Sequence, residues 1–362
     1  MKVKRPTLLL DQKKCRNNIR MMGKKAAKYD LFFRPHFKTH QSLEIGNWFR
    51  EKKVKAITVS SVRMAEYFAC DGWNDITIAF PFNKLEIIEI NSLNNRISLN
   101  LLLQELNSVD FLSQHLKNEA GVFIEIDNGY HRSGIGVDNI FKIQKILNRI
   151  ESTNKLEFKG FLTHAGNTYQ TKSPEEVITI HQQTKQQLFQ LKEKFLTTNS
   201  ELITSIGDTP SCCLANDFNG IDEIRPGNFV FFDLMQVLLG SCNYEQIAMI
   251  VACPVVAGNS DRKEIIIYGG AVHLAKEYVT FEGNTCYGLV VYLTDSEWSE
   301  PLERTYVSEL SQEHGIIKTT EKIYQQIIKQ DVIGIIPVHS CLTANLMSYY
   351  RTLEGLKITR LS

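Results

Sequence analysis

The chain has 362 residues, of which 43% are hydrophobic and 22% charged, as in a globular protein with one large barrel or two ordinary domains. Its 41 basic and 40 acidic residues nearly cancel, and no basic run is interleaved with aromatic residues, which argues against a nucleic-acid partner. No uncharged apolar stretch reaches about 18 residues, so we expect neither a membrane span nor a signal peptide. Eight scattered cysteines without a CxxC pair predict reduced thiols and a cytoplasmic location.

From about residue 30 to residue 235, short β-rich apolar runs alternate with longer amphipathic segments. The runs have the near-continuous apolar character of strands buried on both faces, and they occupy residues 31–37, 56–61, 75–81, 96–103, 122–127, 158–164, 201–207 and 223–232. Helices are predicted at 42–53, 62–72, 137–151 and 173–195, the last with Ser173 as its N-cap and Pro174 in its first position. Eight βα repeats predict an α/β fold, a (β/α)8 TIM barrel over residues 12–235.

After about residue 240 the pattern changes to apolar runs at 247–258, 263–274, 287–293 and 331–340, which are separated by turn residues. Long helical patterns largely disappear there. The sequence therefore predicts a second, mostly antiparallel β domain made of residues 236–362 together with the amino-terminal strand in residues 1–11.

Polar side chains follow several of the predicted barrel strands, at the end where barrel active sites lie. Lys38 follows the first strand within the sequence RPHFKTH, and the turn GDTPS, residues 207–211, follows the seventh. The turn can direct backbone N–H groups and hydroxyls at a phosphate. A lysine desolvated beside Arg34 or Arg132 is expected to have a lowered pKa and to condense with an aldehyde. Together these features indicate pyridoxal phosphate.

As an ordered series, several motifs resemble the fold-type III pyridoxal phosphate enzymes, and most closely the D-threonine aldolase and D-serine dehydratase group with its alanine racemase-like N-terminal domain. The motifs are RPHFKTH, DNGYHRSGI, THAGNTY, GDTPS, EIRPGNFVFFDLMQ and PVHSCLTANL. The resemblance covers nearly the whole chain. It also implies a homodimer with shared active sites.

The resemblance implies a role for each matching residue. Lys38 and Tyr169 would be catalytic, with Lys38 forming the Schiff base and Tyr169 lying beside the substrate. The residues implied to contact the cofactor are Lys38, Arg132 near the ring oxygen, His164 against the ring, Tyr169, the phosphate ligands Gly207, Asp208, Thr209 and Ser211, and Arg225 near the pyridine nitrogen.

His339 and Cys341 are separated by one residue at the end of an apolar run, so both side chains would face the same side of an extended strand. A histidine and a cysteine so spaced are more often incidental than a metal site, but two ligands can form an open catalytic site completed by water and substrate. The resemblance favours a metal, since dehydratases of this group have histidine and cysteine here and aldolases have histidine and aspartate. A thiolate favours zinc.

We therefore expect a lyase that acts on D-3-hydroxy amino acids, most plausibly by metal-assisted dehydration of D-serine-like substrates. The alternatives are a D-threonine aldolase, an amino-acid racemase and a non-catalytic carrier of pyridoxal phosphate. The C-terminal domain argues against the carrier. The sequence departs from the family pattern at Asp208, at Phe232 and in the segment GGAVHLAKE, residues 269–277, and these departures bear on the substrate.

Overall fold

The computed structural model describes residues 3–196, 202–294 and 296–361, so residue 201, the start of the seventh predicted run, lies outside the described residues. Contacts divide the chain into a barrel unit, residues 21–227, and a β unit, residues 1–20 with 228–362. Helix α1, Gln12–Lys28, runs across this division. Its first turns belong to the β unit, where Asn18 Nδ2 donates a hydrogen bond of 2.8 Å to the carbonyl of Gln246.

The barrel unit is built on parallel strands, and each of the eight predicted runs overlaps one of them, although β6 and β8 begin two residues before their runs. Their bounds are β2 Phe32–Phe33, β3 Ile57–Val59, β4 Asp75–Pro81, β5 Ser98–Leu103, β6 Ala120–Asp127, β8 Leu156–Leu162, β9 Ile203–Ile206 and β10 Glu223–Ile224. Neighbours follow the order β2, β10, β9, β8, β6, β5, β4, β3. The ring closes because His36 forms a parallel bridge with Thr58 and Phe37 donates to the Thr58 carbonyl at 2.8 Å. The predicted (β/α)8 barrel is confirmed.

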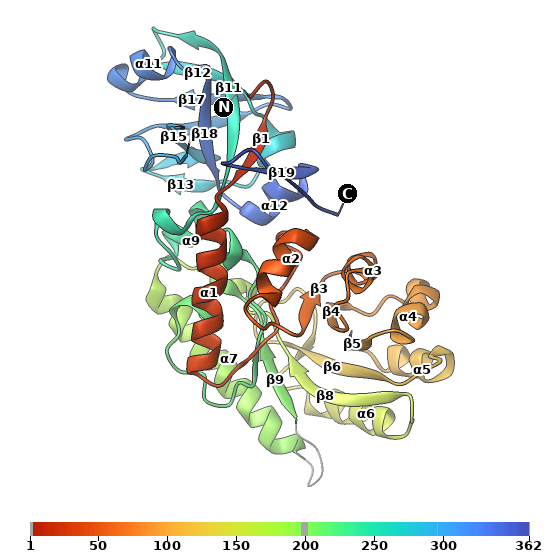
Figure 1. Ribbon diagram of the computed structural model, residues 1–362. Coiled ribbons are helices and arrows are strands. Elements are labelled where there is room, and N and C mark those ends of the chain that lie inside the picture. Colours follow the sequence, from red (N-terminus) through yellow and green to blue (C-terminus); the bar gives the residue numbers. More distant parts are fainter. Residues whose placement is uncertain (1–2, 197–201, 295, 362) are drawn as a thin grey trace. The chain divides into compact units, whose positions relative to one another are not determined.

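Helices follow the strands along the outer side of this sheet, as Figure 1 shows for α3 to α6. The bounds in the barrel unit are α2 Leu43–Arg50, α3 Val62–Cys70, α4 Ile87–Asn94, α5 Leu106–His115, α6 Ile140–Glu151, α7 Pro174–Phe195 and α8 Thr209–Leu214, with the 3-10 helices η1 Lys84–Glu86 and η2 Gly166–Gln170. The predicted start of α7 is confirmed, since the Ser173 hydroxyl accepts the N–H of Glu176 at 3.3 Å. Strand β7, Ile135–Gly136, pairs only with β6.

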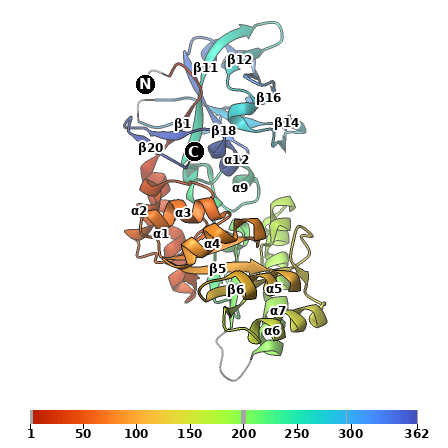
Figure 2. The same cartoon turned by 90° about the vertical axis from the view of Figure 1, so that its right-hand side faces the viewer.

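The β unit consists largely of strands. Its strands are β1 Thr7–Leu10, β11 Met249–Asn259, β12 Glu264–Tyr268, β13 Val279–Phe281, β14 Asn284–Cys286, β15 Gly288–Val291, β16 Tyr306–Leu310, β17 His314–Lys318, β18 Val332–Pro337, β19 Tyr349–Thr352 and β20 Lys357–Thr359. Of these, β1, β11, β12 and β18 are labelled in both views (Figures 1 and 2). Its helices are α9 Leu234–Leu238, α10 Ala271–Leu274, α11 Glu321–Ile327 and α12 Ser340–Asn345, with the 3-10 helices η3 Asn228–Val230 and η4 Tyr244–Gln246.

Most of these strands form one sheet that closes on itself. The sheet order is β12, β17, β16, β15, β18, β11, β1, β19, β20, and β12 also pairs with β11, which closes a ring. Strand β11 serves both β18 and β12 because its register shifts between Val255 and Ala257. Every pairing in this sheet is antiparallel except β1 with β19. The predicted mostly antiparallel β domain is confirmed.

In the part of the chain that the structure describes, no helix has the length and apolar character needed to cross a membrane.

Candidate active site

Lys38 lies just beyond β2, at the carboxyl end of the strand ring. Its backbone N–H donates to Nδ1 of His36 at 3.4 Å. His40, on the other side of the lysine, is fully buried, and its ring centroid lies 4.4 Å from that of Phe37. The two histidines of RPHFKTH therefore differ in role: His36 faces the lysine, whereas His40 packs in the hydrophobic core.

Three cations surround two imidazole rings at this end of the barrel. Burial lowers the pKa of His36 well below its usual range, and the charges of Lys38, Arg225 and Arg132 lower it further. Burial and the same three cations lower the pKa of His164, although a hydrogen bond with the Gly207 backbone opposes them. Both rings are therefore neutral at pH 7, and the structure brings together Lys38, Arg132, His164 and Arg225.

Arg34, the cation that the sequence places closest to Lys38, has carboxylate partners instead. Its Nε lies 2.6 Å from Glu223 Oε2, and its Nη1 lies 2.5 Å from Asp75 Oδ1. These contacts link the end of β2 to β10 and β4. Burial would lower the pKa of Arg34, but the charges of Glu223 and Asp75 raise it, so Arg34 is a structural ion-pair partner of these two residues. The effect of the Arg34 charge on Lys38 stays a prediction.

Arg225, at the end of β10, is fixed beneath the turn that contains Gly207. Its Nε donates to Ser205 Oγ at 2.6 Å and its Nη2 to the Thr163 carbonyl at 2.7 Å. Burial lowers its pKa to about 10, against the charge of Glu223, so the guanidinium stays charged at pH 7. A Cβ on Gly207 would lie 2.8 Å from Arg225 Nη1, which explains why this turn has glycine.

The turn after β9 offers two hydroxyls to an anion. Thr209 Oγ1 and Ser211 Oγ are buried and make no hydrogen bond of normal geometry among the described residues. Buried hydroxyls are usually satisfied, so both fit a ligand with strong acceptor oxygens such as a phosphate. Burial raises the pKa of Asp208, and the nearby Ser211 side chain opposes that shift. Asp208 is the N-cap of α8, since its Oδ1 accepts the N–H of Ser211 at 2.7 Å and lies 3.1 Å from the Thr168 hydroxyl. This geometry accounts for an acidic residue in a phosphate turn.

Tyr169 stands beside the same turn. The N–H of Thr209 donates to the Tyr169 hydroxyl at 3.3 Å, and the Tyr169 ring centroid lies 6.2 Å from that of His164. A Cβ on Gly166 would lie 2.3 Å from the ring of Tyr130, so only glycine fits at this position. The guanidinium of Arg132 lies over this same Tyr130 ring, with its carbon 5.4 Å from the ring centroid.

Glu125 in β6 lies near the cations Arg132 and Arg225, although the sequence reasoning did not single it out. Glu125 Oε1 accepts the Ser133 hydroxyl at 2.7 Å, whereas its buried Oε2 has no partner in the described ranges. Burial raises the pKa of Glu125, against the charges of Arg132 and Arg225. The signal available in the sequence was a single glutamate inside an apolar strand, because a buried carboxylate requires a partner.

The other candidate pair, His339 and Cys341, lies in the β unit. Strand β18 ends at Pro337, His339 is the N-cap of α12, and Cys341 lies in its first turn. The argument from strand alternation is therefore wrong. The two side chains are nevertheless hydrogen-bonded, because the turn from strand to helix brings them together.

The carboxylate of Asp233 holds the turn between β18 and α12 in place. Asp233 Oδ2 accepts the N–H of Ser340 at 2.8 Å and the amide of Asn228 at 2.5 Å. Asn228 Nδ2 in turn lies 3.7 Å from Cys341 Sγ. Phe232, one of the sequence departures, is buried nearby in the chain with φ 53°. The sequence reasoning missed both Asn228 and Asp233, which follow β10 as a polar pair in an apolar stretch.

His339 has two hydrogen-bond partners of its own. Its Nδ1 lies 2.6 Å from Glu277 Oε2. Burial would lower its pKa, but hydrogen bonds with Cys341 and Glu277 raise it to about 11. The pKa of Cys286, another cysteine of the β unit, is raised to about 11 mainly by burial. The imidazole and thiol of His339 and Cys341 are a donor set that fits zinc, which displaces protons from such ligands.

Two donors are all that the described residues supply here, since no group of three or more His, Cys, Asp or Glu side chains among them could hold a metal ion. A two-residue site leaves several coordination positions for water and substrate. Such an open site is the catalytic rather than the structural form of zinc site.

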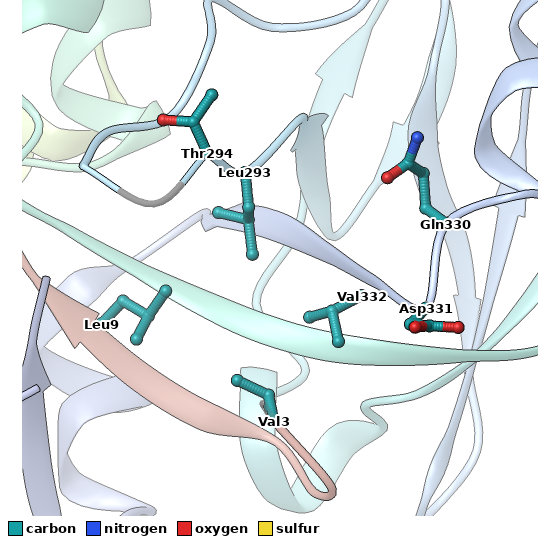
Figure 3. Close-up of a pocket in the computed structure, with 7 residues that line it drawn as sticks. All are labelled: Val3, Leu9, Leu293, Thr294, Gln330, Asp331 and Val332. Carbon is teal, nitrogen blue, oxygen red and sulfur yellow. The ribbon is translucent and has the colours of Figure 1, made fainter. Parts of the chain in front are cut away.

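A separate cavity of about 430 Å³ lies in the β unit (Figure 3). Leu9, Leu293 and Val332 form its apolar wall, and Gln330 and Asp331 lie at one end. No candidate site residue lines it, so it takes no part in the chemistry described above.

Two family models match successive parts of the chain. Residues 10–234 match the model described as "Alanine racemase, N-terminal domain", and residues 248–353 match the model described as "Putative serine dehydratase domain". The second range contains His339 and Cys341. The resemblance to the fold-type III group is confirmed.

Individual relatives cover nearly the whole chain. A D-serine dehydratase of Dictyostelium discoideum is 27% identical over an alignment of 385 positions that covers 97% of this chain and 93% of that protein. A D-threo-3-hydroxyaspartate dehydratase of Delftia sp. (strain HT23) is 26% identical over 97% of this chain and 94% of its own length. Its solved structure superimposes with a TM-score of 0.92 at 25% identity and covers 99% of this chain and 98% of that one. Another structure of that enzyme, with a TM-score of 0.91, 24% identity and coverage of 99% and 98%, is described as a cysteine-to-alanine mutant in the metal-free form.

Proposed function

The chain belongs to the family of the alanine racemase N-terminal domain, and on this basis we propose that it is a pyridoxal phosphate-dependent lyase that dehydrates D-amino acids with a 3-hydroxyl group. The observation that carries the proposal is the pair of buried hydroxyls without a partner in the described chain, Thr209 and Ser211, at the same end of the barrel as Lys38. This end of the barrel therefore has hydroxyl groups that can bind a phosphate and an amine that can react with an aldehyde. The names of the relatives, two dehydratases of D-hydroxy amino acids, support the reaction class.

Each barrel residue has a binding or orienting role in this proposal. Thr209 and Ser211 would donate to the phosphate, Lys38 would hold the cofactor through Nζ, and Arg132 would contact the ring oxygen. The guanidinium of Arg225, which is fixed by Ser205 and Thr163, would contact the ring nitrogen. When bound, pyridoxal phosphate withdraws electrons from the substrate Cα, so that its proton becomes acidic.

The proton chemistry then belongs to the side chains beside the ring. Lys38 Nζ would take the α-proton once the substrate amine has replaced it on the cofactor and left it as a free amine. His36 and His164 are neutral at pH 7 because burial and the neighbouring cations lower the pKa of both, so neither ring repels the positive charge that Lys38 acquires when it takes the α-proton. The Tyr169 hydroxyl, which accepts the N–H of Thr209, is oriented by the phosphate turn and lies beside the substrate.

His339 and Cys341 hold a zinc ion in this proposal. A Lewis acid on the 3-hydroxyl stabilises the negative charge of the departing hydroxide, as it does in lowering the pKa of bound water from about 15.7 to about 7. The relative described in a metal-free form carries alanine in place of a cysteine, which supports a metal bound through a thiolate in that enzyme. The match of residues 248–353 to the serine dehydratase model favours dehydration over aldol cleavage.

Product analysis tests the reaction. Purified protein supplied with pyridoxal phosphate and zinc is mixed with D-serine or D-threo-3-hydroxyaspartate, and ammonia and the 2-oxo acid are measured. D-serine is expected to give pyruvate and ammonia, and L-serine to give neither. Glycine and an aldehyde from D-threonine would identify an aldolase instead, and metal-independent interconversion of alanine enantiomers would identify a racemase. Bound cofactor without turnover of any of these amino acids would favour a carrier.

Two further parts of the proposal concern the setting of the enzyme. We infer a homodimer from the family resemblance, and sedimentation of the purified protein tests it. A cytoplasmic location is proposed from the eight cysteines without a CxxC pair, and fractionation of cells that produce the protein tests that assignment.

A further inference from the structure

Glu277 is the last residue of GGAVHLAKE, the segment that departs from the family pattern and that the proposed function leaves without a role. Its Oε2 lies 2.6 Å from His339 Nδ1, although 62 residues separate the two in the chain. The side chain of Glu277 is 36% exposed and that of His339 is 22% exposed. The unexplained segment therefore supplies a carboxylate to a candidate metal ligand.

An unusual backbone conformation brings Glu277 to this place. Helix α10 ends at Leu274, and Ala275 follows with φ 66° and ψ 172°. A residue with a Cβ rarely adopts this conformation, which persists only where the surroundings impose it. The hydroxyl of Thr343 donates to the Leu274 carbonyl at 3.1 Å and so holds the end of α10 against α12, the helix that begins after His339.

The contact decides which ring nitrogen of His339 is available. A carboxylate accepts hydrogen bonds, so Nδ1 must carry the hydrogen that it donates to Glu277. Nε2 is then the nitrogen left for a metal. Glu277 is not itself part of a ligand set, because the described residues contain no group of three His, Cys, Asp or Glu side chains that could hold a metal ion.

We propose that Glu277 is the positioning residue of the metal site: it fixes the ring of His339 and its tautomer so that Nε2 binds the metal, and it does not bind the metal itself. Carboxylates that accept the second N–H of a histidine ligand orient the ring and increase the basicity of the ligand. The inference rests on the proposed binding of zinc by His339 and Cys341.

The test is a zinc-binding measurement that does not depend on turnover. Zinc affinity of the pyridoxal phosphate-loaded protein is measured by competition with a chromophoric chelator. Glu277→Ala is expected to weaken zinc binding about 10- to 100-fold. Glu277→Gln is expected to lose less than Glu277→Ala, because the amide oxygen still accepts the N–H of His339. At saturating metal, the visible spectrum of the cobalt-substituted Glu277→Ala protein is expected to match the wild type.

The matched control is Glu313→Ala, since Glu313 Oε2 lies 3.7 Å from Nε2 of His273, another histidine of the β unit. Its zinc affinity is expected to equal that of the wild type. Glu277→Ala binding within threefold of the wild type, an equal loss in Glu277→Gln or Glu313→Ala, or a changed cobalt spectrum would each overturn the inference. A wild-type protein that binds no zinc would overturn the metal site of the proposed function as well, and so separates the two failures.

Discussion

Replacing Ser211 by alanine is expected to stabilise the cofactor-free protein and to weaken its binding of pyridoxal phosphate. Ser211 is 1% exposed, and its Oγ has no hydrogen-bond partner within the described residues. Its backbone N–H donates to Asp208 Oδ1 at 2.7 Å, and that bond survives the substitution. The change therefore removes only the hydroxyl.

The gain in stability of the cofactor-free protein and the loss in binding free energy for pyridoxal phosphate have opposite signs and similar sizes. Burying a hydroxyl without a partner costs about 1–3 kcal/mol, and alanine is a better helix former than serine by roughly 0.5 kcal/mol. The cofactor-free protein should gain about 1–3 kcal/mol, which raises the unfolding midpoint by roughly 2–4 °C per kcal/mol. A hydrogen bond to a charged group contributes about 1.5–3 kcal/mol, so its loss should weaken binding roughly 10- to 150-fold.

Two measurements on the same preparation check this prediction: the thermal unfolding midpoint without cofactor, and the dissociation constant from a spectrophotometric titration with pyridoxal phosphate. Ser42→Ala is the matched control, because Ser42 is equally buried but its hydroxyl accepts the N–H of Ile45 at the start of α2. That variant should lose about 1 kcal/mol of stability and keep its affinity. A Ser211→Ala protein that is destabilised and binds the cofactor normally would refute the phosphate assignment.

The remaining predictions concern the cofactor, the metal and pH. Lys38→Ala should lose the visible absorption of bound pyridoxal phosphate, and an unchanged spectrum would show that another lysine holds it. Cys341→Ala, or chelation, should abolish pyruvate formation and leave that absorption intact, and full activity after either would exclude the metal. Because burial keeps His36 and His164 neutral in the folded protein while unfolded histidines bind protons below about pH 6.5, the free energy of unfolding should fall with decreasing pH below that value, by about 1.4 kcal/mol per pH unit for each ring. The free energy of unfolding of His164→Gln, measured with urea at several pH values, should depend less on pH than that of the wild type. An unchanged pH dependence would contradict the assignment of a neutral His164.

The sequence by itself determined the strands, the helix starts and the lysine motif. The eight apolar runs each overlap a barrel strand because continuous hydrophobicity is a local requirement of a strand buried on both faces. Ser173 and Pro174 predicted the start of α7 because capping depends on residues within one turn. The position of Lys38 after the first strand followed in the same way, since parallel strands of a barrel present their carboxyl ends together.

The tertiary structure decided the partners of these residues. Whether Arg34 faces Lys38 or a carboxylate depends on Asp75 and Glu223, which lie 41 and 189 residues away in the chain. The contact of Glu277 with His339 likewise follows from how α10 and α12 pack. Propensity and periodicity act over a few residues, whereas these contacts require the register of strands and the docking of helices that are distant in sequence, and only the folded chain specifies them.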